Sequence, residues 1–508
     1  MSIIRYFKAC YAHNPLTCIL AVALLLRLVA AIFARGYGML DDHFLVIEAP
    51  ASIAAGFDFS GWLPSSPNNE GPTGQNFFYM GLHYLLFVLL NAIGLTSPDT
   101  QMYVVRILHA VYSISIVYFG YKIAEKYAGK KPAAQVGWLL AAFWFMPWLS
   151  VRNLVEVHCI PFLLWGVWMY IKRDSPGVKT ALLSGLVAGV AFSIRYQAIF
   201  MLAGFGLALL CLKQFRNAIV WGAGALLSMF LIQGGIDFYF WGKPCVEFMA
   251  YLHYNLIVVQ PGDYPGGGPL KYVALIAGIL VPPVSIFIFG GFFVRWRKYL
   301  LLFLPSFIFL LFHSIFSNKQ ERFIFTIVPF IIILGMIGWH ELLASYSKVT
   351  WLNKLARGSW KFFMVANAAL LCVVSVHYSK KARVESMLYL SRYQGIEHLA
   401  KMDNIPFLPL FYLGEWATTL TDIDRNDIDG CAQRLLESGS APRFVLVTDD
   451  ENAAPRVEAL KRHFPELVFE AQIKPSLIDN LMFFLNPRHN INETISIYRN
   501  QKYFPDKR

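Results

Sequence analysis

Eleven mainly apolar runs, separated by short polar segments, constrain the fold of this chain more than any other feature of its sequence. Runs of roughly 17–25 such residues are long enough to cross a bilayer. Apolar residues make up 56% of the 508 positions and charged residues only 15%, which is not the balance of a soluble globular protein. We therefore predict an α-helical polytopic membrane protein. The expected spans lie near residues 17–34, 103–123, 133–150, 154–171, 180–195, 197–212, 218–233, 271–293, 299–316, 323–341 and 360–377.

A twelfth apolar segment, residues 77–95, decides the topology, because every later loop changes side if this segment crosses the membrane. If it lies along the outer surface, the inward loops carry 15 Lys and Arg residues and the outward loops after residue 123 carry five. Cytoplasmic loops are enriched in these residues, so we predict that 77–95 does not span. The N-terminus is then inside and the C-terminus outside, and the first outer loop covers residues 35–102.

The net charge of +12 raises the question of a nucleic-acid partner. The basic residues cluster in short segments between apolar runs, which is typical of cytoplasmic loops. We therefore expect no nucleic acid among the partners. The cysteines are odd in number and show no metal-binding spacing, so no metal site is expected.

Hydropathy falls after about residue 380, so we divide the chain into a membrane domain, residues 1–379, and a soluble α/β domain, residues 380–508, on the outer face. The soluble domain shows no catalytic motif and is expected to be accessory. Alternating apolar residues predict strands, and apolar residues at helical spacing predict helices. The expected strands are 407–413, 443–448 and 466–473, and the expected helices are 427–438 and 452–463.

The polar segments of the membrane domain other than the basic loops all fall on the predicted outer side. A single outward-facing site is the economical explanation. These segments are residues 35–76, 151–158, 193–197, 233–269 and 317–323.

The stretch GYGMLDDHF, residues 37–45, places Asp41 and Asp42 where the first span surfaces, followed by His43. The simplest interpretation is a helix end among lipid headgroups. A partly desolvated carboxylate at this depth is also suited to act as a general base. Neighbouring residues rarely point the same way, so we expect one of the two acids to be catalytic and the other structural.

Buried arginines are the second candidate feature, because an arginine at membrane depth is costly unless it is paired or faces an anion or a cavity. Arg195, in the segment SIRYQ, lies between two apolar runs, and Arg27 and Arg106 are open to the same interpretation or to snorkelling toward headgroups. Arg152 and Glu156 are four residues apart and could form a helix-surface ion pair.

The segment SNKQERF, residues 317–323, is the one dense charge cluster on the predicted outer face of the membrane domain. Lys319 and Arg322 could grip a phosphate, with the arginine supplying two parallel donors. Glu321 lies between them.

These motifs resemble those of the mannosyltransferases that use dolichol-phosphate-mannose in asparagine-glycan and GPI-anchor assembly. SNKQERFIFTIVP is similar to their H-K-E-x-R-F-x-x-P signature, and QGGIDFYFWGKP, which contains Asp237 and Tyr239, to their D-S-x-x-Y-G segment. GYGMLDDHF resembles their H-P-D-E-x-F loop. The chain departs from the family at Met39 and Leu40, where the family has His and Pro, and at Asp42, where it has Glu. A further departure is Asn318, where the family has His.

The resemblance implies a GT-C membrane glycosyltransferase that transfers a sugar, mannose or a similar hexose, with inversion from a polyprenyl-phosphate donor to a lipid-linked glycan or another extracytoplasmic acceptor. It implies Asp41 and Asp42 as the catalytic pair and Lys319, Arg322 and Arg195 as ligands of the donor phosphate. Substrate-binding or structural roles fall to the remaining motif residues: His43, Arg152, Glu156, Asp237, Tyr239 and Glu321. No cofactor and no metal are expected.

Two alternatives remain open from the sequence. One is a transporter or a flippase of lipid-linked sugars, which would explain the spans and the buried arginines but predicts charges near the bilayer midplane. The other is a glycosyltransferase directed at protein or lipid A, which shares the architecture. The compact loops favour a bacterial inner membrane with the site facing the periplasm; in a eukaryote the site would face the lumen of the endoplasmic reticulum.

Overall fold

The chain forms two compact units, each assembled from separate segments. The first contains residues through Ala31, Gly61–Leu82 and Arg106–Ser375, and the second contains Ile32–Ser60, His83–Val105 and the residues from Val376 onward. The computed structural model describes residues 9–260, 262–263, 266–402, 407–448, 453–487, 490 and 493–504. The domain boundary predicted at residues 379 and 380 stays a prediction.

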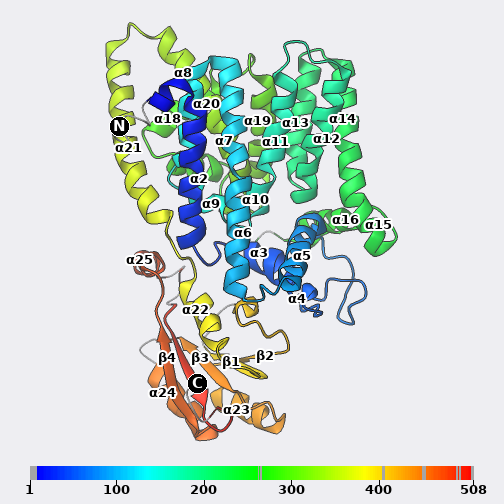
Figure 1. The fold of residues 1–508 in the computed structure, drawn as a ribbon, viewed down its shortest axis with the longest axis vertical. Helices are drawn as coiled ribbons and strands as arrows, with labels where there is room; N and C mark the ends of the chain where they lie inside the picture. The colour runs from blue at the N-terminus through cyan, green and yellow to red at the C-terminus, as the bar shows by residue number, and fades with distance from the viewer. Residues whose placement is uncertain are drawn as a thin grey trace. The chain divides into compact units, whose positions relative to one another are not determined.

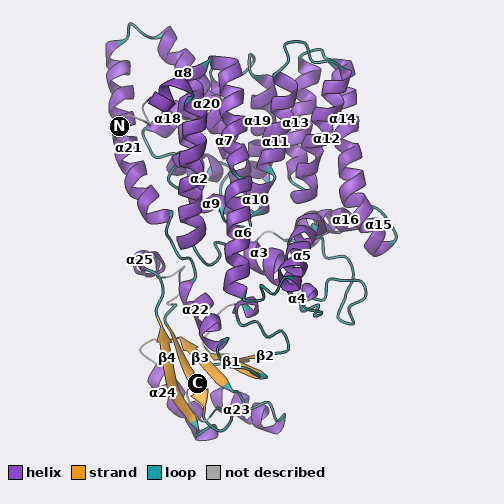
Figure 2. Cartoon of the chain, in the orientation of Figure 1, coloured by secondary structure: helices purple, strands orange, loops and turns teal. Residues whose placement is uncertain are grey.

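The first unit is helical (Figures 1 and 2). Its helices are α2 (Pro15–Phe33), α7 (Ile114–Ala128), α8 (Lys130–Ala142), α9 (Met146–Ser150), α10 (Val155–His158), α11 (Ile160–Ile171), α12 (Val178–Ile194), α13 (Ala198–Cys211), α14 (Phe215–Met229), α15 (Gly235–Trp241), α16 (Val246–His253), α17 (Lys271–Ile279), α18 (Val284–Phe293), α19 (Leu300–Ile315), α20 (Val328–Ser345) and α21 (Thr350–Val374). Short π-helical and 3₁₀ segments are η2 (Phe230–Gly234), η3 (Tyr254–Val258) and η4 (Glu321–Ile327). Two further helices, α5 (Phe77–Ala92) and α6 (Pro98–Tyr112), contain residues of both units, and the last two residues of α2 also belong to the second unit.

Several of these helices are long and apolar enough to cross a membrane, as the sequence predicts. Among the described residues there are five: Pro15–Phe33, Pro98–Ala128, Phe215–Trp241, Glu321–Ser345 and Thr350–Val374. Shorter apolar helices cover most of the other predicted spans. The segment predicted to lie along the surface is the helix α5, and its position outside the bilayer stays a prediction.

Helix α20 is the centre of the first unit. Every residue from Val328 to Trp339 is buried, whereas an amphipathic helix would bury one face only. It packs closely on α18, because a Cβ atom on Gly338 would collide with the carbonyl of Gly291. Small residues at such contacts let membrane helices approach each other.

Two of the predicted spans are interrupted. The segment 133–150 forms α8 and α9 with a break after Ala142, and the segment 271–293 forms α17 and α18 with a break before Pro283. At the first break, Asn367 of α21 accepts a hydrogen bond from the Trp144 amide (2.8 Å) and donates one to the Ala142 carbonyl (2.9 Å). Backbone that leaves a helix at membrane depth needs such partners, because lipid offers none.

The second unit combines the residues after the first span with the C-terminal region. Its elements are α3 (Asp41–His43), η1 (Phe44–Glu48), α4 (Ala49–Ala54), α22 (Lys381–Leu390), β1 (His398–Met402), η5 (Leu410–Tyr412), β2 (Thr419–Ile423), α23 (Ile428–Glu437), β3 (Phe444–Thr448), α24 (Ala453–His463), β4 (Leu467–Ile473), α25 (Leu477–Leu485) and β5 (Ile495–Asn500).

The five strands form one mixed sheet in the order β2-β1-β3-β5-β4 (Figure 2). β1 pairs in parallel with β2 and β3, whereas β5 pairs antiparallel with β3 and β4. Strand residues alternate between two cores, as the twofold side-chain period requires. Phe444 and Leu446 face the core shared with α22, and Val445 and Val447 face the core shared with α23 and α24.

The predicted strands 443–448 and 466–473 are confirmed as β3 and β4, and the predicted helices as α23 and α24, although residue 452 lies outside the described residues. The predicted strand 407–413 is wrong. Its described residues contain the 3₁₀ turn η5, and Leu408, Leu410, Phe411, Tyr412 and Leu413 are all buried. An apolar run that is buried on every side does not need the alternating contacts of a sheet, so its hydropathy alone does not specify a strand.

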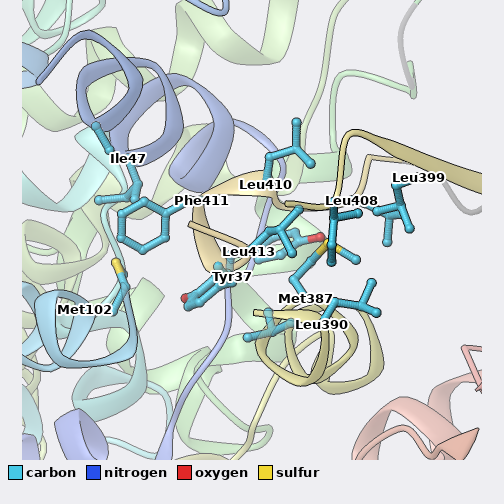
Figure 3. Close-up of a cluster of buried hydrophobic side chains, with 14 of the residues drawn as sticks. Tyr37, Ile47, Met102, Met387, Leu390, Leu399, Leu408, Leu410, Phe411 and Leu413 are labelled. Atoms are coloured by element: carbon cyan, nitrogen blue, oxygen red, sulfur yellow. The ribbon is translucent and has the colours of Figure 1, made fainter. Parts of the chain in front are cut away.

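The core of the second unit joins segments that are far apart in the sequence. Figure 3 shows Tyr37 and Ile47, which follow the first span, packed with Met102 and with the C-terminal Met387 and Phe411. The loop that carries Asp41 and Asp42 is therefore built together with the C-terminal region, whose accessory role stays a prediction.

Candidate functional site

Glu156 joins two arginines in the first unit. Its Oε1 atom lies 3.9 Å from Nη2 of Arg195 and 3.9 Å from Nε of Arg322. Glu156 is 3% exposed, Arg195 2% and Arg322 9%, so the three charges are removed from bulk water. Charge interactions are stronger in the protein interior than in water. The three side chains together carry a net charge of +1. The structure thus brings together two of the three residues predicted to bind phosphate, and adds a carboxylate.

Arg195 is held from several directions. It follows α12, where the backbone turns to an extended conformation, and its Nε donates to Gln197 Oε1 (3.1 Å). Its Nη1 donates to the Phe323 carbonyl (3.1 Å) and to the hydroxyl of Thr326. Thr326 in turn donates to the carbonyl of Glu156 (2.9 Å). The guanidinium therefore has a fixed orientation, and its Nη2 has no hydrogen-bond acceptor among the described residues.

The charged side chains of the cluster 317–323 have separate partners. Arg322 donates from Nε to Gln320 Oε1 (3.0 Å) and faces Glu156. Glu321 is half exposed and pairs with Lys271 at 3.3 Å. Lys319 is buried, and its ammonium donates to the carbonyl of Phe316. That carbonyl is the contact the structure shows for its head group, so its predicted role in holding phosphate stays a prediction.

Arg152 lies beside an aromatic and imidazole cluster. Its guanidinium is 4.7 Å from the centre of the Trp148 ring, and its carbonyl contacts Nε2 of His158 at 2.7 Å. The rings of His158 and His109 lie 4.0 Å apart, and the Tyr79 hydroxyl contacts His109 at 3.1 Å. Glu156 is not part of a helix-surface ion pair with Arg152, the pairing considered from the sequence. It is buried and faces Arg195 and Arg322.

Arg27 and Arg106 have structural roles. Arg27 donates to Ser113 Oγ (3.0 Å) and to the carbonyls of Leu140 (3.0 Å) and Ala141 (3.2 Å). Arg106 donates to the carbonyl of Ala31 at 2.8 Å. Both side chains tie neighbouring helices of the first unit together.

Two neighbouring carboxylates, Asp237 and Glu247, stabilise the loop before α5. Asp237 is fully buried and accepts hydrogen bonds from Gln233 Nε2 (2.8 Å) and from the Glu247 amide (3.1 Å). Glu247 accepts from the amide of Gly74 at 2.7 Å. Burial raises the pKa of the Glu247 carboxyl to about 7; the Gly74 N–H opposes this, and the charge of Asp237 adds to it.

Gly74 has a positive φ of 76°, and a Cβ there would approach the backbone of Tyr251 to 3.0 Å, so the close approach needs glycine. Tyr239 is 83% exposed and lies outside the buried contacts of Asp237 and Glu247.

The outward segments predicted to form one face do contact each other within the first unit. Gln197 Nε2 donates to the Tyr251 hydroxyl (2.5 Å), Tyr196 donates to the Gln75 carbonyl (3.2 Å) and Asn76 to the Phe192 carbonyl (3.2 Å). Thr326, Gln197, Tyr251 and Glu247 were not singled out from the sequence. All four lie in or near the segments that were examined. Three of them are uncharged and the fourth is an isolated acid, so none stands out in the sequence as a candidate site residue.

The two acids of the first outer loop have different surroundings in the second unit. Asp42 is buried and accepts hydrogen bonds from the amides of Gly38 (2.9 Å) and Met39 (3.0 Å), which fixes the turn that precedes it. Asp41 is only partly buried. The expectation that one acid is structural fits Asp42.

His43 is stacked between the rings of Tyr37 (4.9 Å) and Tyr412 (5.3 Å), and its Nε2 lies 3.2 Å from Glu48 Oε2. Glu48 also accepts from the Leu410 amide at 3.1 Å. These contacts make His43 a buried part of the loop's support, with its ring held between two tyrosines. Among the described residues, no group of three His, Cys, Asp or Glu side chains could hold a metal ion.

Solved structures with a similar fold define the class. The chain matches ArnT from Cupriavidus metallidurans bound to undecaprenyl phosphate with a TM-score of 0.60 at 13% identity, over 95% of this chain and 97% of that one. The apo form of the same protein matches with a TM-score of 0.60 at 14% identity, over 96% and 98%. The fold is that of the membrane-embedded GT-C glycosyltransferases.

The family follows from the sequence itself. The pattern of the Alg9-like mannosyltransferase family matches residues 18–409, and the chain belongs to this family. The comparison with curated proteins gives no match. The chain is therefore a glycosyltransferase, as the motifs predict, and family membership decides against the transporter and flippase alternative.

Proposed function

We propose that this chain is an inverting glycosyltransferase of a bacterial inner membrane, with its site facing the periplasm. It moves a sugar, mannose or a similar hexose, from a polyprenyl-phosphate donor to a lipid-linked glycan or another extracytoplasmic acceptor. The observation that carries the proposal is the buried pair Arg195 and Arg322 sharing the single carboxylate of Glu156. The undecaprenyl phosphate bound by ArnT, a protein of similar fold, supports the choice of donor.

The arginine pair suits a phosphate that gains charge as it leaves. In the transfer, the acceptor oxygen forms a bond to the anomeric carbon while the bond from that carbon to the phosphate oxygen breaks, and the electron pair leaves with the phosphate. Guanidinium groups placed before the reaction stabilise this charge without reorganisation. Nη2 of Arg195, which donates no hydrogen bond to the described residues, is the atom we assign to a phosphate oxygen. Glu156 keeps the two guanidiniums oriented and lowers their mutual repulsion.

We assign the proton of the acceptor hydroxyl to the carboxylate of Asp41. This group is only partly buried, and Asp42, whose oxygens accept hydrogen bonds from the backbone of its own loop, is the buried one of the two acids. A base in contact with the acceptor removes the proton as the new bond forms. The phosphate leaves as an anion already charged in the donor, so we propose that the reaction needs neither a metal nor another cofactor.

The test uses the full chain in lipid nanodiscs with radiolabelled polyprenyl-phosphate sugars and three acceptor preparations: lipid-linked glycans, lipid A and a membrane-protein fraction. We expect label to transfer from one donor to one acceptor class in the presence of a chelator. Transfer only from nucleotide sugars, or only with added divalent metal, would contradict the proposal. Transfer to lipid A or to protein would redirect the acceptor and keep the donor chemistry.

A matched pair of variants separates the phosphate site from general damage. Arg195→Ala removes the Nη2 donor, and we expect it to abolish transfer. Arg216→Ala changes an exposed arginine on a predicted cytoplasmic loop and should leave transfer unchanged.

A further inference from the structure

Helix α25, Leu477–Leu485, exposes its apolar side chains. None of its residues is buried, and Leu477 is 79% exposed, Phe484 81% and Leu485 67%. The spacing of Leu477, Leu481, Phe484 and Leu485 places them on one face of the helix. A continuous apolar face of this kind on a soluble unit marks a surface that contacts something else.

The opposite side of α25 is attached to the segment that follows the last candidate span. Asp479 is two positions from Leu477 and from Leu481, so it points away from their face. Its carboxylate lies 3.7 Å from Nε2 of His377 and accepts a hydrogen bond from the Lys381 amide (3.4 Å). The amide of Asp479 donates to the Ser476 hydroxyl at 3.2 Å, which caps the helix start.

Covalent connection fixes where this attachment point lies. The last candidate span, Thr350–Val374, ends three residues before His377. Three residues extend at most about 11 Å, even when fully stretched. The headgroup layer on each side of the hydrocarbon core is about 5–8 Å thick. His377, which contacts Asp479 in the first turn of α25, is therefore held within about 11 Å of the residue where this candidate span ends.

We propose that α25 is an interfacial helix that inserts its apolar face into the boundary between headgroups and acyl chains, in the leaflet where α21 ends. Amphipathic helices bind in this way, with a few large apolar side chains below the headgroups. Lys474, exposed just before the helix, suits the phosphates of the same layer. The contact holds the sheet of the second unit against the bilayer and is independent of the sugar transferred.

The test places the full chain in vesicles of phosphatidylethanolamine and phosphatidylglycerol that carry a photoactivatable diazirine on the acyl chain. After irradiation and digestion, mass spectrometry locates the lipid adducts. We expect adducts on the peptide that contains residues 477–485. Labelled transmembrane peptides without adducts on this peptide would overturn the proposal, and so would cross-links from α25 to a second copy of the chain in place of lipid.

A double variant, Leu481→Ser with Phe484→Ser, should lower the adduct yield at α25 roughly tenfold or more, because each large apolar side chain contributes strongly to burial. The matched control is Leu436→Ser, which changes an apolar residue of α23 that is 47% exposed. It should leave the yield at α25 unchanged. Equal yields for the double variant and the wild type would also overturn the proposal, and the wild-type labelling decides the question even if the double variant does not fold.

Discussion

At the scale of single residues, Glu156 lowers the electrostatic cost of burying the guanidiniums of Arg195 and Arg322. Two guanidiniums buried without an anion repel each other and lose the hydration of their charges. One carboxylate 3.9 Å from each offsets this cost while leaving a positive net charge. A buried group with one charge in excess is stable enough to fold and still attracts an anion, which is the electrostatic condition for a phosphate site.

The first prediction concerns Arg322→Lys, which keeps the charge and removes the planar fork. We expect donor use, measured as kcat/KM for the donor, to weaken by about 1–3 kcal/mol, the scale of a charge-assisted hydrogen bond. Arg216→Lys, at an exposed position, is the control. Unchanged donor kinetics in Arg322→Ala would remove this residue from the site.

The second prediction separates the two acids of the first outer loop. Asp41→Asn keeps the size of the side chain and loses its basicity, so turnover should fall roughly 10²–10⁴-fold with no loss of thermal stability. Asp42→Asn disturbs the bonds to Gly38 and Met39, so it should lower the melting temperature and reduce turnover less. Turnover and melting of both purified variants check this. If the order is reversed, the roles of the two acids are exchanged.

The third prediction is a pH effect. The pKa of Glu247, raised by burial to about 7, means that the folded chain keeps this proton to a higher pH than the unfolded chain, whose carboxyl has its ordinary value of 4.5. The free energy of unfolding therefore falls as the pH rises from about 4.5 to about 7, and is flat above it. Glu247→Gln has no carboxyl to titrate, so its melting temperature in detergent should lack the decrease that Glu247 causes between about pH 4.5 and 7. Glu458→Gln, which changes an exposed acid, should retain it; identical curves for Glu247→Gln and the wild type would contradict the assignment.

The sequence identified the buried charges well because a charge in an apolar context carries a large energetic cost and is therefore conspicuous. It singled out Arg195, Arg322 and Glu156, which the structure brings together. It did not pair Glu156 with those two arginines, because its neighbour four residues away, Arg152, is the partner that local helix geometry suggests. Pairing across 39 residues, from Glu156 to Arg195, depends on tertiary structure.

At the scale of elements, the breaks in the predicted spans show what hydropathy omits. The run 133–150 is mainly apolar, so the sequence predicts one helix, but the helix stops at Ala142. The partner of the exposed backbone is Asn367, which lies more than 200 positions later in α21. The same limit applies to β1, β2 and β5, which are short and were not predicted, because their pairing and not their composition makes them strands.

The fourth prediction tests this support. Asn367→Leu has a similar size and fits an apolar helix, but it leaves the Trp144 amide and the Ala142 carbonyl without their side-chain partner. We expect a loss of about 1–3 kcal/mol in stability per unsatisfied group, seen as a lower melting temperature in detergent. Val365→Leu, at an exposed position of α21, should have little effect. Equal melting of the Asn367 variant and the wild type would mean that the break has other support.

At the scale of the whole molecule, the predicted topology assigns a side to every loop. The positive-inside asymmetry places Lys131 in the cytoplasm and the segment 317–323 outside. The structure shows that three of the outward segments, 151–158, 193–197 and 317–323, meet around Glu156, which agrees with a common face.

The fifth prediction checks that assignment with cysteines at exposed positions. In a background where the exposed Cys211 and Cys372 are replaced by Ser, Ser317→Cys should react with a membrane-impermeant maleimide in intact spheroplasts, and Lys131→Cys only after lysis. Labelling of both residues from the same side would refute the topology.

The shared core of the second unit has a consequence for the order in which a ribosome delivers this protein. The acid-bearing loop is among the first segments to be synthesised, yet Tyr412 and Leu410, which support His43 and Glu48, are synthesised only after the last candidate span. Until then the loop lacks its core, and Asp41 has no fixed surroundings. An interrupted chain that already contains every candidate span therefore still lacks the residues that support the loop of Asp41, the base that we propose.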